Sequence, residues 1–212
     1  YTREPVFAEL LREALRLGYR LVPYETPNKP GERQQDRETG QAQAIADLLA
    51  REPSAKVLVH AGYAHIGEAQ QGLPDDARPM AMELARLTGL PVLTIDQTST
   101  RSYETADIDT VGQRLARQFA LSVPSVLLSR DGVDAWSYRP GLNDVSVLLP
   151  AAPAGQAQRP DWLSLGGKRG VVAIDLTPCA GHLPCLAEAR HADEGDEAIP
   201  ADQFLMLATS EA

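Results

Sequence analysis

The chain has 212 residues, of which 43% are hydrophobic and 23% charged, so it can bury a core and is not of the disordered class. Its net charge of −9 repels phosphate backbones and anionic membrane surfaces, and its 5% of aromatic residues gives few platforms for stacking single-stranded bases. No apolar run approaches the roughly 18 residues of a membrane span. We therefore expect neither a nucleic acid nor a membrane span to define the function.

Helices and strands are expected to alternate along residues 1–121. Apolar residues recur at helical spacing in four segments, and the three short apolar runs between them have the composition of buried strands. This order predicts an α/β fold in which crossover helices join the strands of a parallel sheet. Because the runs are continuously apolar, helices are expected on both faces of the sheet. The predicted helices are 4–17, 36–51, 78–88 and 107–121, and the predicted strands are 19–24, 56–61 and 91–96.

The ends and faces of these helices follow from particular residues. Gly18 and Gly89 are expected to end the first and third helices, because glycine tolerates the left-handed conformation of a helix C-terminus. Asp107 or Asp109 is expected to cap the fourth. The residues predicted to face inward from the second helix are Ala42, Ile45, Leu48 and Leu49.

The pattern changes after about residue 121. Short apolar runs at 125–132, 135–141, 145–150 and 169–176 follow one another without long helices, and a Pro/Ala-rich stretch interrupts them. We expect residues 122–212 to form a β-rich, antiparallel extension of the same domain. The aromatic residues expected in the core of this extension are Trp136, Tyr138 and Trp162.

Ionisable side chains gather where the predicted parallel strands end. Glu25 follows the first strand, His60 and His65 close the second, and Asp96 ends the third. The carboxyl ends of neighbouring parallel strands lie side by side and are the usual ligand edge of such sheets. Imidazole and carboxylate together suit a divalent metal site or an acid/base pair. The alternatives are a hydrogen-bonded structural histidine at His60 and, just beyond the turn, a solvated carboxylate at Glu68.

Two further residues are placed near this edge by the second helix. Arg37 and Gln41 are four residues apart, so they share one helix face, and the helix begins just after the loop that follows Glu25. Arg37 is expected to neutralise Glu25 or to hold a substrate oxygen. The alternative is a plain surface helix with Arg37 and Glu38 in water. Gly62 is expected to let the chain turn towards His65, with a positive φ that other residues avoid.

The sequence resembles the superfamily that includes the erythromycin esterases and the ChaN, TraB and Tiki proteins. The GxxH motif Gly62–His65 closes an apolar run, as does the second motif of that group, and Glu25 and Arg37 match its strand-end glutamate and helical arginine. The resemblance covers about residues 1–100. The family's first motif, of GExH or GxxH type, has no match here. The chain begins at Tyr1 without a methionine, so we expect a fragment or processed product whose first motif and export signal lie upstream.

The resemblance implies a hydrolase acting on a small molecule or a peptide. It implies catalytic roles for His65, Glu25 and Arg37, and one version of the site has a divalent metal held by His65 and Glu25. The residues expected to bind substrate, from their places at the strand ends and on the second helix, are His60, Gln41 and Asp96. The alternative on the same fold is a non-catalytic metal- or haem-binding protein, with Tyr63 or His65 as the haem ligand. A third reading is a fragment without a complete site. An extracytoplasmic bacterial location is expected.

The chain has two cysteines, and they lie close together in the motif CAGHLPC. Cys179, His182 and Cys185 have soft ligand atoms, but their spacing is not that of a common zinc module, so no metal is expected there. A short-range disulfide is the second interpretation. The favoured interpretation is two free thiols in a loop.

Overall fold

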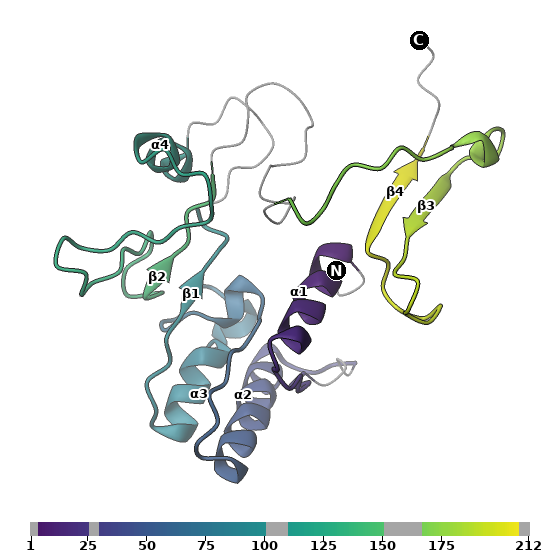
Figure 1. Ribbon diagram of the computed structural model, residues 1–212. Coiled ribbons are helices and arrows are strands. Elements are labelled where there is room, and N and C mark those ends of the chain that lie inside the picture. Colours follow the sequence, from purple (N-terminus) through teal and green to yellow (C-terminus); the bar gives the residue numbers. More distant parts are fainter. Residues whose placement is uncertain (1–3, 26–29, 101–109, 151–166, 208–212) are drawn as a thin grey trace. The chain divides into compact units, whose positions relative to one another are not determined.

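The computed structural model describes residues 4–25, 30–100, 110–150 and 167–207 (Figure 1). It is a mixed α/β structure with helices and two small sheets, one parallel and one antiparallel. The chain forms two compact units, one of Tyr24–Gly170 and one of Tyr1–Pro23 with Val171–Ala212. The predicted change of pattern at residue 121 falls inside the first of these, and the division of the chain there stays a prediction.

The core of the Tyr24–Gly170 unit lies between two helices that run side by side (Figure 1), α2 (Gln34–Arg51) and α3 (Met80–Thr88). Both helices are confirmed close to their predicted bounds, and Gly89 ends α3 with a φ of 67°, as expected. Three of the four residues predicted to face inward from α2 are buried, and the fourth, Leu49, packs against the core. The buried cluster consists of Ala42, Ile45, Met80 and Leu84.

The segments predicted as the first two strands are not strands. The structure assigns none at residues 19–24 or 56–61. In the second segment Val59 packs against the α2–α3 core, whereas its neighbour Leu58 is 76% exposed. Val92 and Leu93 repeat this alternation, with Leu93 69% exposed. These segments therefore bury one face against the helices and leave the other uncovered, contrary to the prediction of two covered faces.

The parallel sheet in the described residues is small and joins the two predicted halves of the domain. β1 (Ile95–Asp96) pairs in parallel with β2 (Val145–Ser146). The third predicted strand is thus confirmed in part, but its parallel partner comes from the region expected to form the antiparallel extension. Two isolated antiparallel bridges, Ser125–Leu148 and Leu128–Ala135, lie in that region.

The helix α4 (Val111–Gln118) starts later than predicted and has a different cap. The Thr110 side chain accepts a hydrogen bond from the Gln113 amide, whereas Asp107 and Asp109 lie outside the described residues. Gly112 in its first turn lies against the backbone of Thr100, so close that a Cβ there would be 2.0 Å from the Thr100 carbonyl oxygen. The helix can therefore approach that segment only because residue 112 has no side chain.

Of the three aromatic residues expected in the core of the extension, neither of the two that the structure describes is fully buried. Trp136 is half-buried and Tyr138 is exposed, with their rings 6.3 Å apart, and Trp162 lies outside the described residues.

Short 3₁₀ helices complete the described elements: η1 (Tyr63–His65), η2 (Pro74–Asp76) and η4 (Thr177–Cys179).

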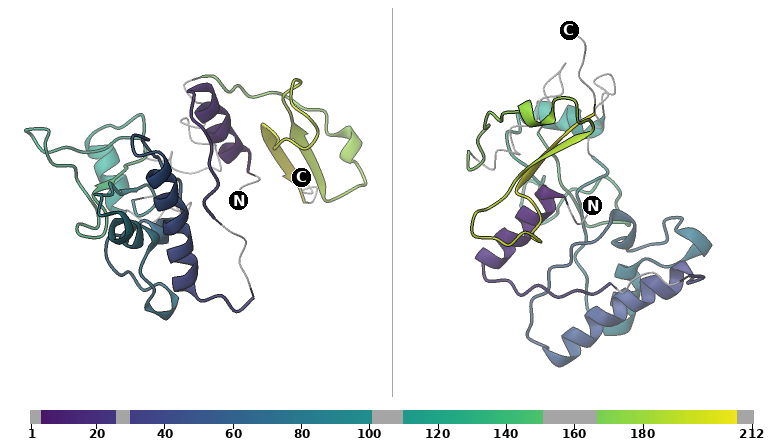
Figure 2. Two further views of the ribbon diagram at one scale, coloured as in Figure 1. Left: turned by 90° about the horizontal axis from the view of Figure 1, so that it is seen from below. Right: turned by 90° about the vertical axis from the view of Figure 1, so that its right-hand side faces the viewer.

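The described residues of the other unit form the helix α1 (Pro5–Arg16) and an antiparallel pair of strands, β3 (Cys185–Ala189) and β4 (Asp202–Met206), besides η4 (Figure 2). α1 is confirmed, and Gly18 follows it with a φ of 84°. Arg12 holds α1 to the β3–β4 connection, because its guanidinium lies 2.6 Å from the Glu194 carboxylate and donates to the Ile199 carbonyl. The sequence predicted a strand at 169–176 instead, and the structure assigns none there.

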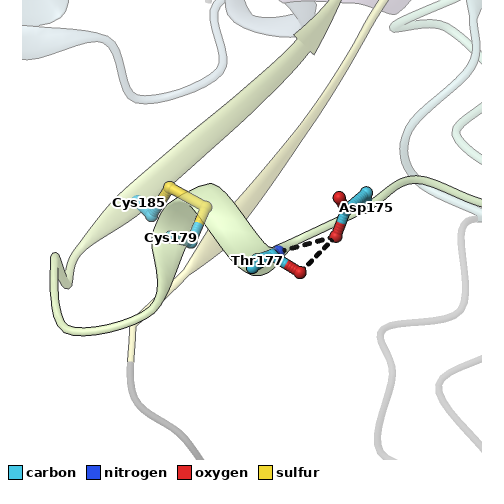
Figure 3. The surroundings of a disulfide bond; sticks show 4 residues. All are labelled: Asp175, Thr177, Cys179 and Cys185. Atoms are coloured by element: carbon cyan, nitrogen blue, oxygen red, sulfur yellow. Dashed lines mark hydrogen bonds between the residues drawn. A yellow bond between two sulfur atoms is a disulfide. The ribbon is translucent and has the colours of Figure 1, made fainter.

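The two cysteines form a disulfide between η4 and the start of β3 (Figure 3). The preference for free thiols was therefore wrong, and the zinc alternative loses two of its three ligands. The preceding turn is fixed separately, because the backbone and hydroxyl of Thr177 both donate to the Asp175 carboxylate. That carboxylate has a pKa below its ordinary value as a result.

Removing this disulfide should lower stability moderately. The cysteines are six residues apart, so closing the loop restricts the unfolded chain little, and we expect the double variant Cys179→Ser, Cys185→Ser to lose about 2 kcal/mol of unfolding free energy. Urea unfolding of the two proteins measures this. Thiol titration of the denatured, unreduced wild-type protein should find no reactive cysteine; two reactive thiols would contradict the assignment.

Candidate functional site

Among the described residues of the Tyr24–Gly170 unit, a deeply buried contact joins the carboxylate of Glu38 on α2 to the imidazole of His65 in η1. Nδ1 of His65 lies 2.8 Å from the Glu38 carboxylate, whose side chain is 0% exposed, while the His65 side chain is 15% exposed. A buried carboxylate beside one ring nitrogen fixes the orientation of an imidazole and favours the tautomer with the proton on that nitrogen. The other nitrogen, Nε2, is then left as the basic atom, and it has no hydrogen-bond partner among the described residues.

Glu38 also begins the next helix. Its carboxylate accepts the backbone N–H of Met80, the first residue of α3, over 2.8 Å, and the amide of Gln34 one turn earlier on α2. A carboxylate at this position satisfies a donor that the helix cannot pair internally and suits the positive end of its dipole. Glu38 therefore connects α2, α3 and η1 through a single buried group.

The sequence analysis missed Glu38 and paired His65 with the wrong carboxylate. One of the two interpretations of this helix left Glu38 in water, and His65 was expected to point towards Glu25, but the structure places the ring against Glu38. The sequence does indicate that Glu38 is buried. It precedes Ala42 by four residues and Ile45 by seven, and so it lies on the buried face of α2. A carboxylate on such a face needs partners.

Gly62 supports His65 in a different way from the one predicted. Its φ is −63°, which is open to other residues, so the turn does not need a left-handed glycine. Instead, a Cβ at this position would lie 3.3 Å from Cδ2 of the His65 ring. The glycine therefore provides room for the imidazole above the backbone.

The second predicted cluster does form. Arg37 pairs with Glu25 through Nη2 and Nε, and the amide of Gln41 donates to the same carboxylate oxygen over 3.2 Å. Gln41 is 3% exposed, and its Oε1 atom has no hydrogen-bond partner. Glu25 thus neutralises Arg37, as one of the predicted roles required, and the plain surface helix is excluded for these residues.

The remaining predicted residues lie apart from this chemistry. His60 is exposed, and its backbone carbonyl accepts the Tyr24 hydroxyl over 2.9 Å. Asp96 is buried in a turn, where Thr98 and Ser99 donate to its carboxylate. Burial would raise the pKa of Asp96, but these hydrogen bonds outweigh it and hold the pKa below its ordinary value. Asp96 is therefore engaged in shaping the end of β1.

Within the described residues no group of three or more His, Cys, Asp or Glu side chains is arranged to hold a metal ion. Glu38, which would have to be a ligand beside His65, already accepts two other donors. The predicted pair of His65 and Glu25 is not in contact in the structure, since each side chain has another partner.

The described parts of the chain contain no helix of the length and apolarity needed to cross a membrane. Comparison of the chain with known protein families, with curated proteins and with solved structures finds no match.

Proposed function

We propose that the protein is a hydrolase in which His65 is the general base and Glu38 the residue that orients it. The observation that carries this proposal is the buried 2.8 Å contact between the Glu38 carboxylate and Nδ1 of His65. The resemblance of Gly62–His65, Glu25 and Arg37 to the erythromycin esterase and ChaN group supports it from the sequence. The substrate is a small molecule or a peptide with an ester, lactone or amide bond.

In this proposal Nε2 of His65 takes a proton from a water molecule, and the water oxygen attacks the substrate carbonyl carbon. The Glu38 carboxylate stabilises the imidazolium that forms, without taking the proton itself. The imidazolium then returns the proton to the leaving oxygen or nitrogen as the carbonyl re-forms. Arg37 is the candidate for stabilising the oxyanion. Glu25 fixes the position of Arg37, and the Gln41 amide in turn donates to Glu25.

The proposal includes the finer architecture expected from the sequence, a parallel sheet with crossover helices in residues 1–121. The parallel pairing of β1 with β2 supports the parallel direction of this sheet, with the partner strand coming from beyond residue 121. An extracytoplasmic setting is also part of the proposal. The disulfide Cys179–Cys185 supports it, because disulfides persist mainly in oxidising compartments.

The test is turnover of a panel of p-nitrophenyl esters and macrocyclic lactones by the wild-type protein and by His65→Ala. A lost general base should lower kcat/KM by about 100-fold or more, with an unchanged circular dichroism spectrum. Glu83→Gln is the matched control, because Glu83 is an equally buried carboxylate on α3 whose partners are Arg78 and Arg86 instead of a histidine.

Equal turnover by His65→Ala and the wild-type protein would contradict the proposal. Haem titration of the same two proteins separates the alternative function. A haem absorbance band that appears with the wild-type protein and is lost in His65→Ala, without ester turnover in either, would favour a haem-binding protein.

A further inference from the structure

A hollow of about 860 Å³ lies on the Tyr24–Gly170 unit. It is lined by α3, by the segment before β1, by residues 133–135, by the start of β2 and by Glu68. This volume falls within the range of about 300–1,000 Å³ typical of small-molecule sites. Most of its lining residues are apolar, and some of these side chains are left in water. Leu93 is 69% and Val133 77% exposed.

The charged residues of this lining all have the same sign. Among the described lining residues the ionisable ones are Glu68, Asp134 and Asp144, and no Lys, Arg or His is found there. Glu68 and Asp144 are both tied to Thr94, since the Thr94 hydroxyl donates to Glu68 over 2.8 Å and the Thr94 amide donates to Asp144 over 2.9 Å. Thr94 therefore holds two carboxylates beside one another although they repel.

We propose that this hollow binds an organic cation with an apolar body, such as an amine that carries an aromatic or alkyl group. The ammonium group would lie between Glu68 and Asp144 and remove their mutual repulsion. The apolar part would cover Leu93 and Val133, which the fold leaves in contact with water. Charge complementarity selects this occupant over a neutral or anionic one, and the inference does not depend on the proposed hydrolase activity.

The proposal has a defined pH dependence. Glu68 is exposed, but the loss of part of its hydration, together with the hydrogen bond and the negative charge of Asp144, raises its pKa above the ordinary value, against the opposing hydrogen bond from Thr94. As pH falls, Glu68 is therefore protonated earlier than an ordinary glutamate. Because protonation removes one of the charges that attract the ammonium group, amine binding should weaken already above the ordinary glutamate range near pH 4.3. Asp134 and Asp144 are the other titratable groups facing the hollow.

The experiment uses three probes with one apolar body and different charge: 4-phenylbutylamine, 4-phenylbutanol and 4-phenylbutyrate. Isothermal titration calorimetry with the full chain at neutral pH should show binding of the amine, about tenfold weaker binding of the alcohol and none of the acid. Glu68→Gln and Asp144→Asn should each weaken amine binding about tenfold. Both variants keep an oxygen that accepts the Thr94 hydrogen bond. Asp47→Asn, on the exposed side of α2, is the control and should leave binding unchanged.

Three results would overturn the inference. The first is equal affinity for the amine and the alcohol, since the carboxylates would then contribute nothing. The second is absence of amine binding by the wild-type protein. The third is tight binding of calcium chloride that is lost in Glu68→Gln while the amine does not bind, which would make the carboxylates an inorganic cation site.

Discussion

Replacing Gly112 with alanine should lower the free energy of unfolding of the protein by about 3 kcal/mol. The new Cβ would lie 2.0 Å from the carbonyl oxygen of Thr100 and 3.0 Å from its carbonyl carbon. Backbone atoms cannot rotate away as a flexible side chain can, so α4 or the Thr100 segment must move. The loss should occur although alanine favours a helix more than glycine by about 1 kcal/mol.

The matched control is Gly40→Ala in the middle of α2. A Cβ at Gly40 meets no atom within 4 Å, so only the helix propensity changes, and stability should rise by up to about 1 kcal/mol. Urea unfolding followed by far-UV circular dichroism measures both variants. If Gly112→Ala is as stable as Gly40→Ala, the approach of α4 to Thr100 does not exist in solution.

Replacing Glu38 with alanine should also cost about 3 kcal/mol of unfolding free energy, because each buried donor left without an acceptor costs about 1–3 kcal/mol. The substitution removes the acceptor of the Met80 amide, which starts α3, and of Nδ1 of His65. Both donors belong to segments that pack around the α2–α3 core. Water can therefore replace the carboxylate only where the packing opens.

Glu83→Ala is the control for this prediction. Glu83 is as deeply buried as Glu38, but its partners Arg78 and Arg86 are 48% and 56% exposed and can turn to water. We expect a loss of about 1 kcal/mol, smaller than for Glu38→Ala. A larger loss for Glu83→Ala than for Glu38→Ala would show that Glu38 is not the carboxylate on which the two helices depend.

A double-mutant cycle separates the two roles of Glu38. The variants Glu38→Ala, His65→Ala and their combination give the coupling free energy of the pair, which should fall in the range of about 0.5–3 kcal/mol for residues in direct contact. If the losses of unfolding free energy in the two single variants simply add up in the double variant, Glu38 stabilises the protein through its hydrogen bond with the Met80 amide alone. His65 would then be left without the carboxylate that the proposed mechanism gives it.

The helices followed from the sequence because the information that specifies them is local. The apolar face of α2 recurs every three or four residues, and Gly89 supplies the left-handed conformation that ends α3. The contact between Arg37 and Glu25 was also predictable, since a loop joins a carboxylate to the first turns of α2. In each case the residues that determine the structure lie within a few turns of one another.

The strands failed for a long-range reason. A run such as Val57–Val59 is apolar whether its two faces pack on helices or one face is left open, and only tertiary contacts distinguish the two. The structure covers the side of Val59 and leaves Leu58 in water. The partner of β1 was missed for the same reason, because β2 lies about fifty residues further along the chain and nothing near β1 specifies it.

The sequence by itself determined the helices, the ends of α1 and α3, and the presence of His65 beyond an apolar run. Only the tertiary structure decided which carboxylate contacts that histidine. Glu25 and Glu38 are the same residue type, and both lie near the start of α2 in the sequence. Their side chains differ in burial, because Glu38 faces the inside of the α2–α3 pair and is 0% exposed, whereas Glu25 is 43% exposed and pairs with Arg37. Burial depends on how helices pack, and packing is a property of segments that are far apart in the chain.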